Sequence, residues 1–225
     1  MPISENPESS APRTRAATGP KPAHSREKIA RAAVELADER GLDAVSIRAV
    51  AQQIGAGAAS LYRYVDTSDH LLDLMVDLVS GEYDFDELTG SPEEQLLALA
   101  VQGRAIMHTH RWLAPLVQTA RVPGPHTLHY LETALGALAG TALLGTQKLQ
   151  TIAMLTAITS AFVINELSQH DTQPRGVAEL GQALASGQYP LLAAAFLQGA
   201  PAVDHDEVFG SLIGNYLRGA GLFEA

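Results

Sequence analysis

The spacing of apolar side chains predicts a helical chain with a helix-turn-helix near its N-terminus. In Ser46–Ile54 the apolar positions repeat at i, i+3, i+4 and i+7, which is one face of an α-helix: Ile47, Val50, Ala51 and Ile54. Gly55 follows at once, where the end of a helix favours a residue that can adopt positive φ. A second short helix, about Gly57–Tyr64, would complete two helices joined by a tight turn, which is the plan of a helix-turn-helix.

Further helices are predicted on both sides of this unit. About Ser25–Arg40 has one apolar face and ends at a glycine, so it completes a compact three-helix unit. Ser91-Pro92-Glu93-Glu94 forms a capping box with proline at the first helical position, which starts a helix reaching about Thr109. The other helices are expected at about 68–81, 111–120, 126–141, 146–169, 177–185, 191–198 and 206–218. In the first of these, three acids are expected to point outward: Asp69, Asp73 and Asp77. Because no segment has a convincing strand pattern, the predicted fold class is all-α.

Composition favours a soluble, cytoplasmic protein with a sizeable core. The 225 residues are 46% hydrophobic and 18% charged, so much apolar surface can be buried. Cysteine is absent, which excludes thiol catalysis, disulfides and Cys-ligated metals, and suits a reducing cytosol. The first residues lack the basic-then-apolar order of a signal peptide. The most membrane-like stretch, Leu149–Asn165, is shorter than the roughly 20 residues of a spanning helix, so we expect a buried helix and no membrane partner.

Charge is distributed unevenly between the two ends of the chain. The net charge is −10, which by itself argues against a nucleic-acid partner. However, residues 10–63 carry nine Lys and Arg against five Asp and Glu, whereas residues 64–225 carry six against eighteen. A basic segment around a helix-turn-helix fits a DNA-reading end on a body that does not bind DNA. An ordinary charge fluctuation in a soluble protein would give the same numbers, so charge alone does not decide.

Residues 25–72 resemble the TetR family of bacterial transcriptional repressors. The resemblance is carried by SREKIARAAVELADERGLDAVSIRAVAQQIGAGAASLYRYVDTSDHLL, about a fifth of the chain. It implies a homodimer with two N-terminal DNA-binding units and an all-α effector domain. We therefore expect a basic, Pro-rich disordered arm in residues 1–24, a DNA-binding domain in 25–66, and a ligand-binding and dimerisation domain in 67–225. Two features depart from the family pattern: Ser68 replaces a phosphate-gripping lysine, and the recognition helix begins with the small residues Gly57-Ala58-Ala59.

The DNA contacts are expected from the two helices of the helix-turn-helix: from the start of Ser46–Ile54 and from Gly57–Tyr64. Arg48 can grip guanine O6 and N7 together, whereas Ser60 offers a hydroxyl and the alanines can only pack on thymine methyls. Tyrosine and serine hydroxyls suit phosphate oxygens, which fix register without reading sequence. Arg48 also has a plainer interpretation as a surface residue paired with an acid. The predicted DNA-binding residues are Ser46, Arg48, Gly57, Ala58, Ala59, Ser60, Tyr62, Arg63 and Tyr64.

A small-molecule pocket is predicted in the larger helical body. An apolar wall with a few polar groups describes such a pocket. The candidates are Met107, Trp112, Leu116, His126, Tyr130, Phe162, Asn165 and Glu166. The plain alternative is that the apolar ones are core and the polar ones face water. His126 and His129 share a helical face without a third ligand, so we expect no metal site, and no cofactor or catalytic motif is evident, which predicts a non-enzyme.

Together these features predict a ligand-responsive repressor that binds a palindromic double-stranded DNA operator as a homodimer. The long Thr146–Gln169 helix and the terminal Asp206–Arg218 helix have surplus apolar surface and would form the dimer interface. A small, largely apolar effector would release the DNA by shifting the fourth helix. Two alternatives stay open: a small-molecule-binding helical protein with weakened or lost DNA binding, and an all-α enzyme that carries a helix-turn-helix-like segment.

Overall fold

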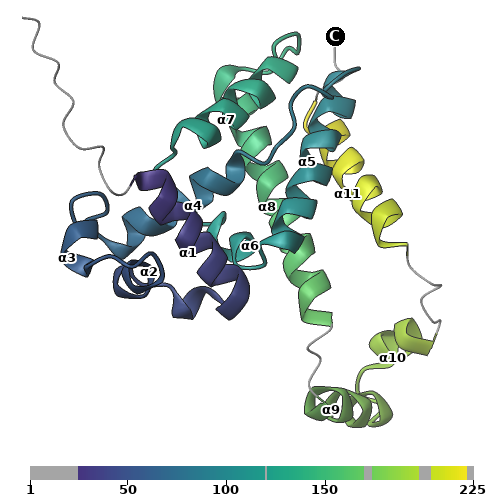
Figure 1. Ribbon diagram of the computed structural model, residues 1–225. Helices are drawn as coiled ribbons and strands as arrows, with labels where there is room; N and C mark the ends of the chain where they lie inside the picture. Colours follow the sequence, from purple (N-terminus) through teal and green to yellow (C-terminus); the bar gives the residue numbers. More distant parts are fainter. Residues whose placement is uncertain (1–24, 120, 170–173, 198–203, 222–225) are drawn as a thin grey trace, which may run out of the picture.

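The computed structural model describes residues 25–119, 121–169, 174–197 and 204–221, and every regular element among them is a helix (Figure 1). The predicted N-terminal arm, residues 1–24, lies outside these ranges. The elements are α1 (Arg26–Arg40), η1 (Leu42–Ala44, a 3-10 helix), α2 (Ile47–Gln53), α3 (Ala58–Leu61), α4 (Ser68–Ser80), α5 (Pro92–Thr109), α6 (Leu113–Leu116), α7 (Pro125–Ala137), α8 (Gly145–Gln169), α9 (Pro174–Ala185), α10 (Pro190–Leu197) and α11 (His205–Gly219). The predicted all-α fold class is confirmed.

Local capping chemistry sets the ends of these helices. The Ser25 hydroxyl accepts a hydrogen bond from the Lys28 amide at 3.1 Å and so caps α1. Gly41 ends α1 at φ +82°, in the left-handed region that glycine adopts without strain. At α5 the predicted capping box is present, because Ser91 and Glu94 each bond the other's backbone amide.

A continuous apolar core joins the N-terminal helices to the body. Ile29 on α1, Val50 on α2 and Leu61 on α3 are almost fully buried in the same cluster as Met75 on α4 and Met107 on α5. Helix α4 packs against both α1 and α7, so it lies between the small N-terminal unit and the larger helices (Figure 1). A displacement of α4 would therefore change its packing against both the N-terminal unit and the larger helices.

The long helix α8 packs along the centre of the body. It is long and apolar enough to cross a membrane by length and composition alone, over Gly145–Ser168. In this fold it packs against α5, α6, α7 and α11, and one of its faces is fully buried at Ile152, Leu155 and Val163. The apolar window of α8 is 39% buried by these neighbours, so one face of the helix belongs to the core of the body.

Three predictions about individual elements differ from the structure. Helix α3 is four residues long and its chain turns at Tyr62–Tyr64, where a helix to Tyr64 was expected. The helix predicted for 111–120 is reduced to α6, and Pro115 explains its later start, because proline lacks the amide that would bond the Arg111 carbonyl. Asp77, expected to face outward, is only 9% exposed, because its carboxylate accepts a hydrogen bond from the Thr127 amide at 2.9 Å near the start of α7. Asp73 is likewise mostly covered, with a side chain 16% exposed.

Candidate DNA-binding surface and effector cavity

The helix-turn-helix is held by its own backbone and by a small apolar core. The Ser46 hydroxyl accepts from the Ala49 amide at 3.1 Å and starts α2. Gly55 adopts φ +68°, and the Ala56 amide then bonds the Ala51 carbonyl at 2.8 Å, which closes the turn. Leu61 is fully buried beneath α3. This geometry fixes the orientation of α3 relative to α2 without any DNA present.

The predicted DNA-binding residues surround this turn, and most of them are open to solvent. Arg48, Tyr62 and Arg63 are exposed, Tyr62 to 52%. Two side chains are already engaged within the protein: the Ser60 hydroxyl donates to the Gly57 carbonyl at 2.6 Å, and Tyr64 is half-buried against the core. Ser60 therefore offers lone pairs as an acceptor rather than its hydrogen as a donor. Ser46, Gly57 and Ala59 are also exposed, and Ala58 is half-buried.

A polar junction connects α1 of the N-terminal unit with the body. The Asp38 carboxylate accepts from the Trp112 indole nitrogen at 2.6 Å and lies 2.9 Å from Nδ1 of His110. Nε2 of His110 lies 3.0 Å from Glu82, just after α4. Both ring nitrogens of His110 thus lie within hydrogen-bonding distance of a carboxylate, one from α1 and one from the segment after α4. His110 and Trp112 are each 6% exposed, whereas the side chains of Asp38 and Glu82 are 30% and 46% exposed, so the two rings are buried and the two carboxylates reach solvent.

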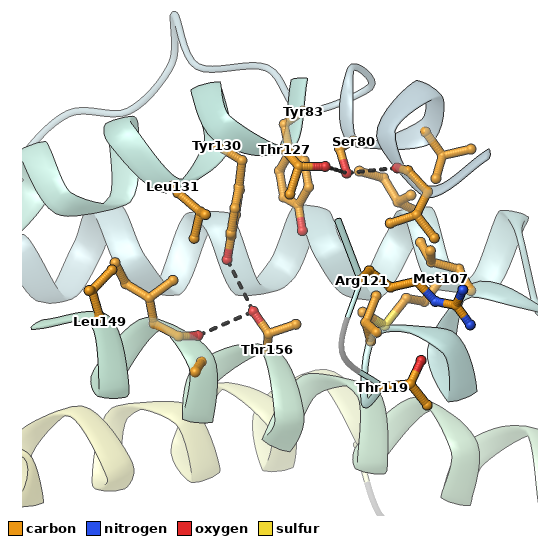
Figure 2. Close-up of a pocket in the computed structure, with 17 residues that line it drawn as sticks. Ser80, Tyr83, Met107, Thr119, Arg121, Thr127, Tyr130, Leu131, Leu149 and Thr156 are labelled. Atoms are coloured by element: carbon orange, nitrogen blue, oxygen red, sulfur yellow. Dashed lines mark hydrogen bonds between the residues drawn. The ribbon is translucent and has the colours of Figure 1, made fainter. Parts of the chain in front are cut away.

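A cavity of about 390 Å³ lies in the body between α4, α5, α7 and α8 (Figure 2). Most of its wall is apolar, from side chains that include Val76, Val79, Ile106, Leu113, Val117 and Ile152. Its polar groups are few: the hydroxyls of Ser80, Thr119, Thr127 and Thr156, two phenols, and one arginine. A cavity of this size and lining suits a small, largely apolar molecule whose orientation is set by a few polar contacts.

Two tyrosines give the cavity neutral hydroxyls. Burial raises the pKa of Tyr83 well above its ordinary value, with a further contribution from the neighbouring Tyr130. Burial also raises the pKa of Tyr130, whose hydroxyl lies 3.4 Å from that of Thr156 (Figure 2). Their rings are 4.8 Å apart. Both phenols therefore keep their protons at neutral pH and can donate to a ligand oxygen.

The structure brings two of the eight predicted ligand residues, Met107 and Tyr130, to the cavity wall. Trp112 belongs to the polar junction, and Leu116 is buried in the core. His126 is exposed beside Gly81, and Asn165 is exposed on α8. The helical repeat shows which residues share a face, but it does not show which face meets a cavity. The sequence therefore could not indicate that these four residues lie away from it.

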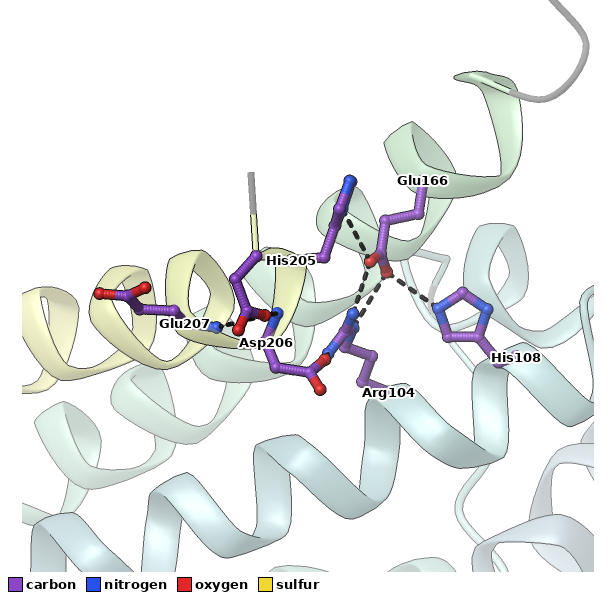
Figure 3. A network of polar contacts seen from close by, with 7 residues as sticks. Arg104, His108, Glu166, His205, Asp206 and Glu207 are labelled. Carbon is purple, nitrogen blue, oxygen red and sulfur yellow. Dashed lines mark hydrogen bonds and ion pairs between the residues drawn. The ribbon is translucent and has the colours of Figure 1, made fainter. Parts of the chain in front are cut away.

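Phe162 and Glu166, the other two, belong to a network that ties α5, α8 and α11 together (Figure 3). Arg104 forms two hydrogen bonds with Glu166, at 2.6 and 3.0 Å, and another with Asp206 at 2.6 Å. Its guanidinium lies 5.4 Å from the Phe162 ring centroid and 5.1 Å from that of Phe209. Two histidines also approach the Glu166 carboxylate: His108 at 2.9 Å and His205 at 3.2 Å. The Glu166 carboxylate is therefore engaged by side chains of the protein itself, and these contacts hold α5, α8 and α11 together.

The sequence reasoning missed most of the cavity wall. Val76, Val79 and Ser80 lie on the helix that follows the DNA-binding unit, and periodicity assigned that helix only an inward apolar face. Arg121 was not singled out, although an arginine next to a Pro-Gly-Pro break was a visible signal. In the part of the chain that the structure describes, no group of three His, Cys, Asp or Glu residues is arranged to hold a metal ion.

Comparison with protein-family models gives two matches along the chain. Residues 29–73 match the model described as bacterial regulatory proteins, tetR family. Residues 86–214 match the tetracyclin repressor-like C-terminal domain. The first match covers α2 and α3, and the second covers α5, α6, α7 and α8, whereas α4, which also lines the cavity, ends before residue 86.

Individual relatives and solved structures agree with these models. The chain is 32% identical over 192 residues to the HTH-type transcriptional repressor DrrR1 of Streptomyces coeruleorubidus, covering 80% of this chain and 71% of that protein. It is 38% identical over 120 residues to an HTH-type transcriptional regulator of Saccharopolyspora erythraea, covering 53% and 51%. Its fold is similar to apo ActR of Streptomyces coelicolor, with TM-score 0.75, 25% identity and coverage of 89% and 99%. ActR in complex with actinorhodin gives TM-score 0.73 at 26% identity, covering 88% and 95%. The chain therefore belongs to the TetR family of bacterial transcriptional regulators.

Proposed function

We propose that the protein is a ligand-responsive repressor that binds a palindromic operator as a homodimer and is released by a small, largely apolar effector. Residues 25–66 would bind DNA, and residues 67–225 would bind ligand and dimerise. The observation that carries this proposal is the position of α4. It packs against α1, with Leu71 and Met75 in the same apolar core as that helix, and it also lines the cavity through Val76 and Val79.

On the DNA side, we propose that Arg48 and Tyr62 make the principal contacts. Both side chains are exposed beside a preformed turn. Arg48 can read guanine bidentately, and one such contact is worth about 1–3 kcal/mol. Tyr62 and Ser46 would hold phosphates. Because α3 presents only small side chains, specificity would rest chiefly on Arg48 and Arg63.

Dimerisation would use the outer faces of α8 and α11. Three large apolar side chains are exposed there, to 42–44%: Met154 on α8, and Val208 and Leu212 on α11. Pairing these helices with their symmetry mates would cover them in a four-helix interface. A twofold dimer would place its two reading heads about 34–36 Å apart, one turn of DNA.

Release would follow from ligand entry. A ligand between α4 and α8 would shift α4, and the separation of the two reading heads would change. Coupling of this kind is reciprocal, so operator DNA should weaken effector binding by the same factor. A titration that finds equal effector affinity with and without operator would contradict this mechanism.

The DNA-binding proposal is tested by a gel shift with the region upstream of the protein's own gene. The wild-type protein should retard a fragment from this region. Arg48→Ala removes one bidentate base contact from each half-site of the dimer, about 2–6 kcal/mol together, so binding should weaken by at least about thirtyfold, and adding Tyr62→Ala should abolish the shift. Arg111→Ala, at an exposed arginine outside the helix-turn-helix, is the matched control and should bind like wild type. An unchanged shift by the double variant refutes the assignment.

The effector side is tested with the same complex. A similar solved structure is that of ActR with actinorhodin, so this compound is a reasonable first probe. Release of the retarded fragment by actinorhodin would support effector control. A protein that binds small molecules but shifts no fragment would instead favour the alternative of lost DNA binding, to which Ser68 and the small residues of α3 point.

A further inference from the structure

Arg121 lies between α6 and α7 and is the cationic residue among those that line the cavity. Figure 2 shows its guanidinium beside Met107 and Thr119, at the end of the cavity away from Tyr130 and Thr156. The side chain is only 17% exposed. An arginine keeps its charge in such a place, because its pKa is too high for burial to neutralise it.

The hydrogen bonds of this guanidinium are incomplete within the described residues. Its Nε is buried and has no acceptor among them. Nη1 lies 3.4 Å from Asp69 and 3.6 Å from Asp73, both on α4. These distances exceed the roughly 2.7–2.9 Å of a strong charge-assisted bond. A buried N–H without an acceptor destabilises the folded protein, so an acceptor oxygen placed beside Nε would remove that penalty.

The surrounding wall makes an anion the best acceptor. Val76, Leu113 and Val117 line the same cavity, and such an apolar wall offers an ion few competing partners, which strengthens a charge interaction beside it. The hydroxyls at the other end are neutral and suit a carbonyl or hydroxyl. The cavity is thus asymmetric, with a cation at one end and neutral donors at the other.

We propose that the effector of this protein carries an acidic oxygen, such as a carboxylate or an ionised phenol, at one end of an apolar body, and that Arg121 Nε binds this oxygen. The inference rests on the proposed function, because it names the chemical class that the effector cavity accepts. It also gives the ligand a direct route to the DNA-binding unit. An anion at Arg121 competes with Asp69 and Asp73, which lie in the first half of α4 and close to the helix-turn-helix.

The test uses two probes of nearly equal size that differ in charge, anthracene carboxylate and anthracene carboxamide. Their affinities for the full-length protein are measured by fluorescence titration. Wild type should bind the carboxylate about ten- to hundredfold more tightly than the carboxamide, because one charge-assisted hydrogen bond is worth about 1.5–3 kcal/mol. Arg121→Met keeps an apolar side chain but loses the donor, and it should abolish this preference. Arg111→Met, at an exposed arginine outside the cavity, should retain it.

Equal affinity of the wild-type protein for the two probes overturns the inference. This comparison uses only the wild-type protein, so it does not depend on whether a variant folds. A preference that survives in Arg121→Met, with that variant folded by circular dichroism, also overturns it. Binding of neither probe counts against the inference as well. The proposed function is judged separately, because the gel shift with the Arg48 and Tyr62 variants uses DNA and no ligand.

Discussion

The junction around Asp38 offers a direct test of how α1 is attached to the body. Replacing Asp38 with alanine removes the acceptor of the Trp112 indole N–H at 2.6 Å and the partner of His110 at 2.9 Å. Trp112 and His110 are each 6% exposed, whereas the Asp38 side chain is 30% exposed, so water can replace the lost carboxylate only in part. The substitution therefore leaves two buried polar groups without their partner on α1.

The size of the effect follows from these contacts. A hydrogen bond to a charged group contributes about 1.5–3 kcal/mol to stability. The Asp38 side chain is itself 30% exposed, so solvent screens part of the interaction and the lower part of that range applies. We expect Asp38→Ala to lower the free energy of unfolding by about 3 kcal/mol for the two bonds together, at about 1.5 kcal/mol each. Glu39→Ala, at an exposed acid on the same helix, should change it by less than about 0.5 kcal/mol.

Urea unfolding monitored by intrinsic fluorescence is the assay, at one protein concentration because dimerisation would contribute to stability. Trp112 is the only tryptophan of the chain, so the signal reports from the junction itself. Asp38→Asn keeps an acceptor oxygen and should lie between wild type and Asp38→Ala. If Asp38→Ala and Glu39→Ala unfold with the same free energy, the junction does not hold α1, and the reasoning is refuted.

Two further predictions concern the body. In Gly124→Ala, at the N-cap of α7, the new Cβ would overlap the Asp77 carboxylate, so the hydrogen bond from the Thr127 amide should break. The free energy of unfolding, measured with urea, should fall by about 1–3 kcal/mol. Gly136→Ala within α7 is the control: its new Cβ meets no atom, so stability should be unchanged or higher. For Glu166, burial acts to raise the pKa, but hydrogen bonds from Arg104 and His108 outweigh it and leave the pKa below its ordinary 4.5. The stability that Glu166 adds over Glu166→Gln is therefore fully present above about pH 4.5 and is lost as pH falls through the lowered pKa, and a constant difference down to about pH 3 would contradict this.

Most of the helices and the helix-turn-helix could be predicted because their sequence signals are local. Apolar spacing at i, i+3 and i+4 defined α2, and the Ser91–Glu94 capping box set the start of α5, since capping depends on four consecutive residues. Gly55 marked the turn because positive φ is a property of one residue. The helix-turn-helix has the same local origin, and so its exposed Arg48 and Tyr62 could be named in advance.

The cavity and its chemistry were decided only by the tertiary structure. Trp112 and Glu166 were expected at a ligand, but Trp112 bonds Asp38, 74 positions away, and Glu166 pairs with Arg104, 62 positions away. Asp77 was expected at the surface and is buried because α7 begins against it. The sequence by itself therefore determined the helices, the turn and the family, through contacts between near neighbours. Which helix faces enclose a cavity, and which single cation lines it, depends on contacts between distant segments, and those exist only once the helices have packed.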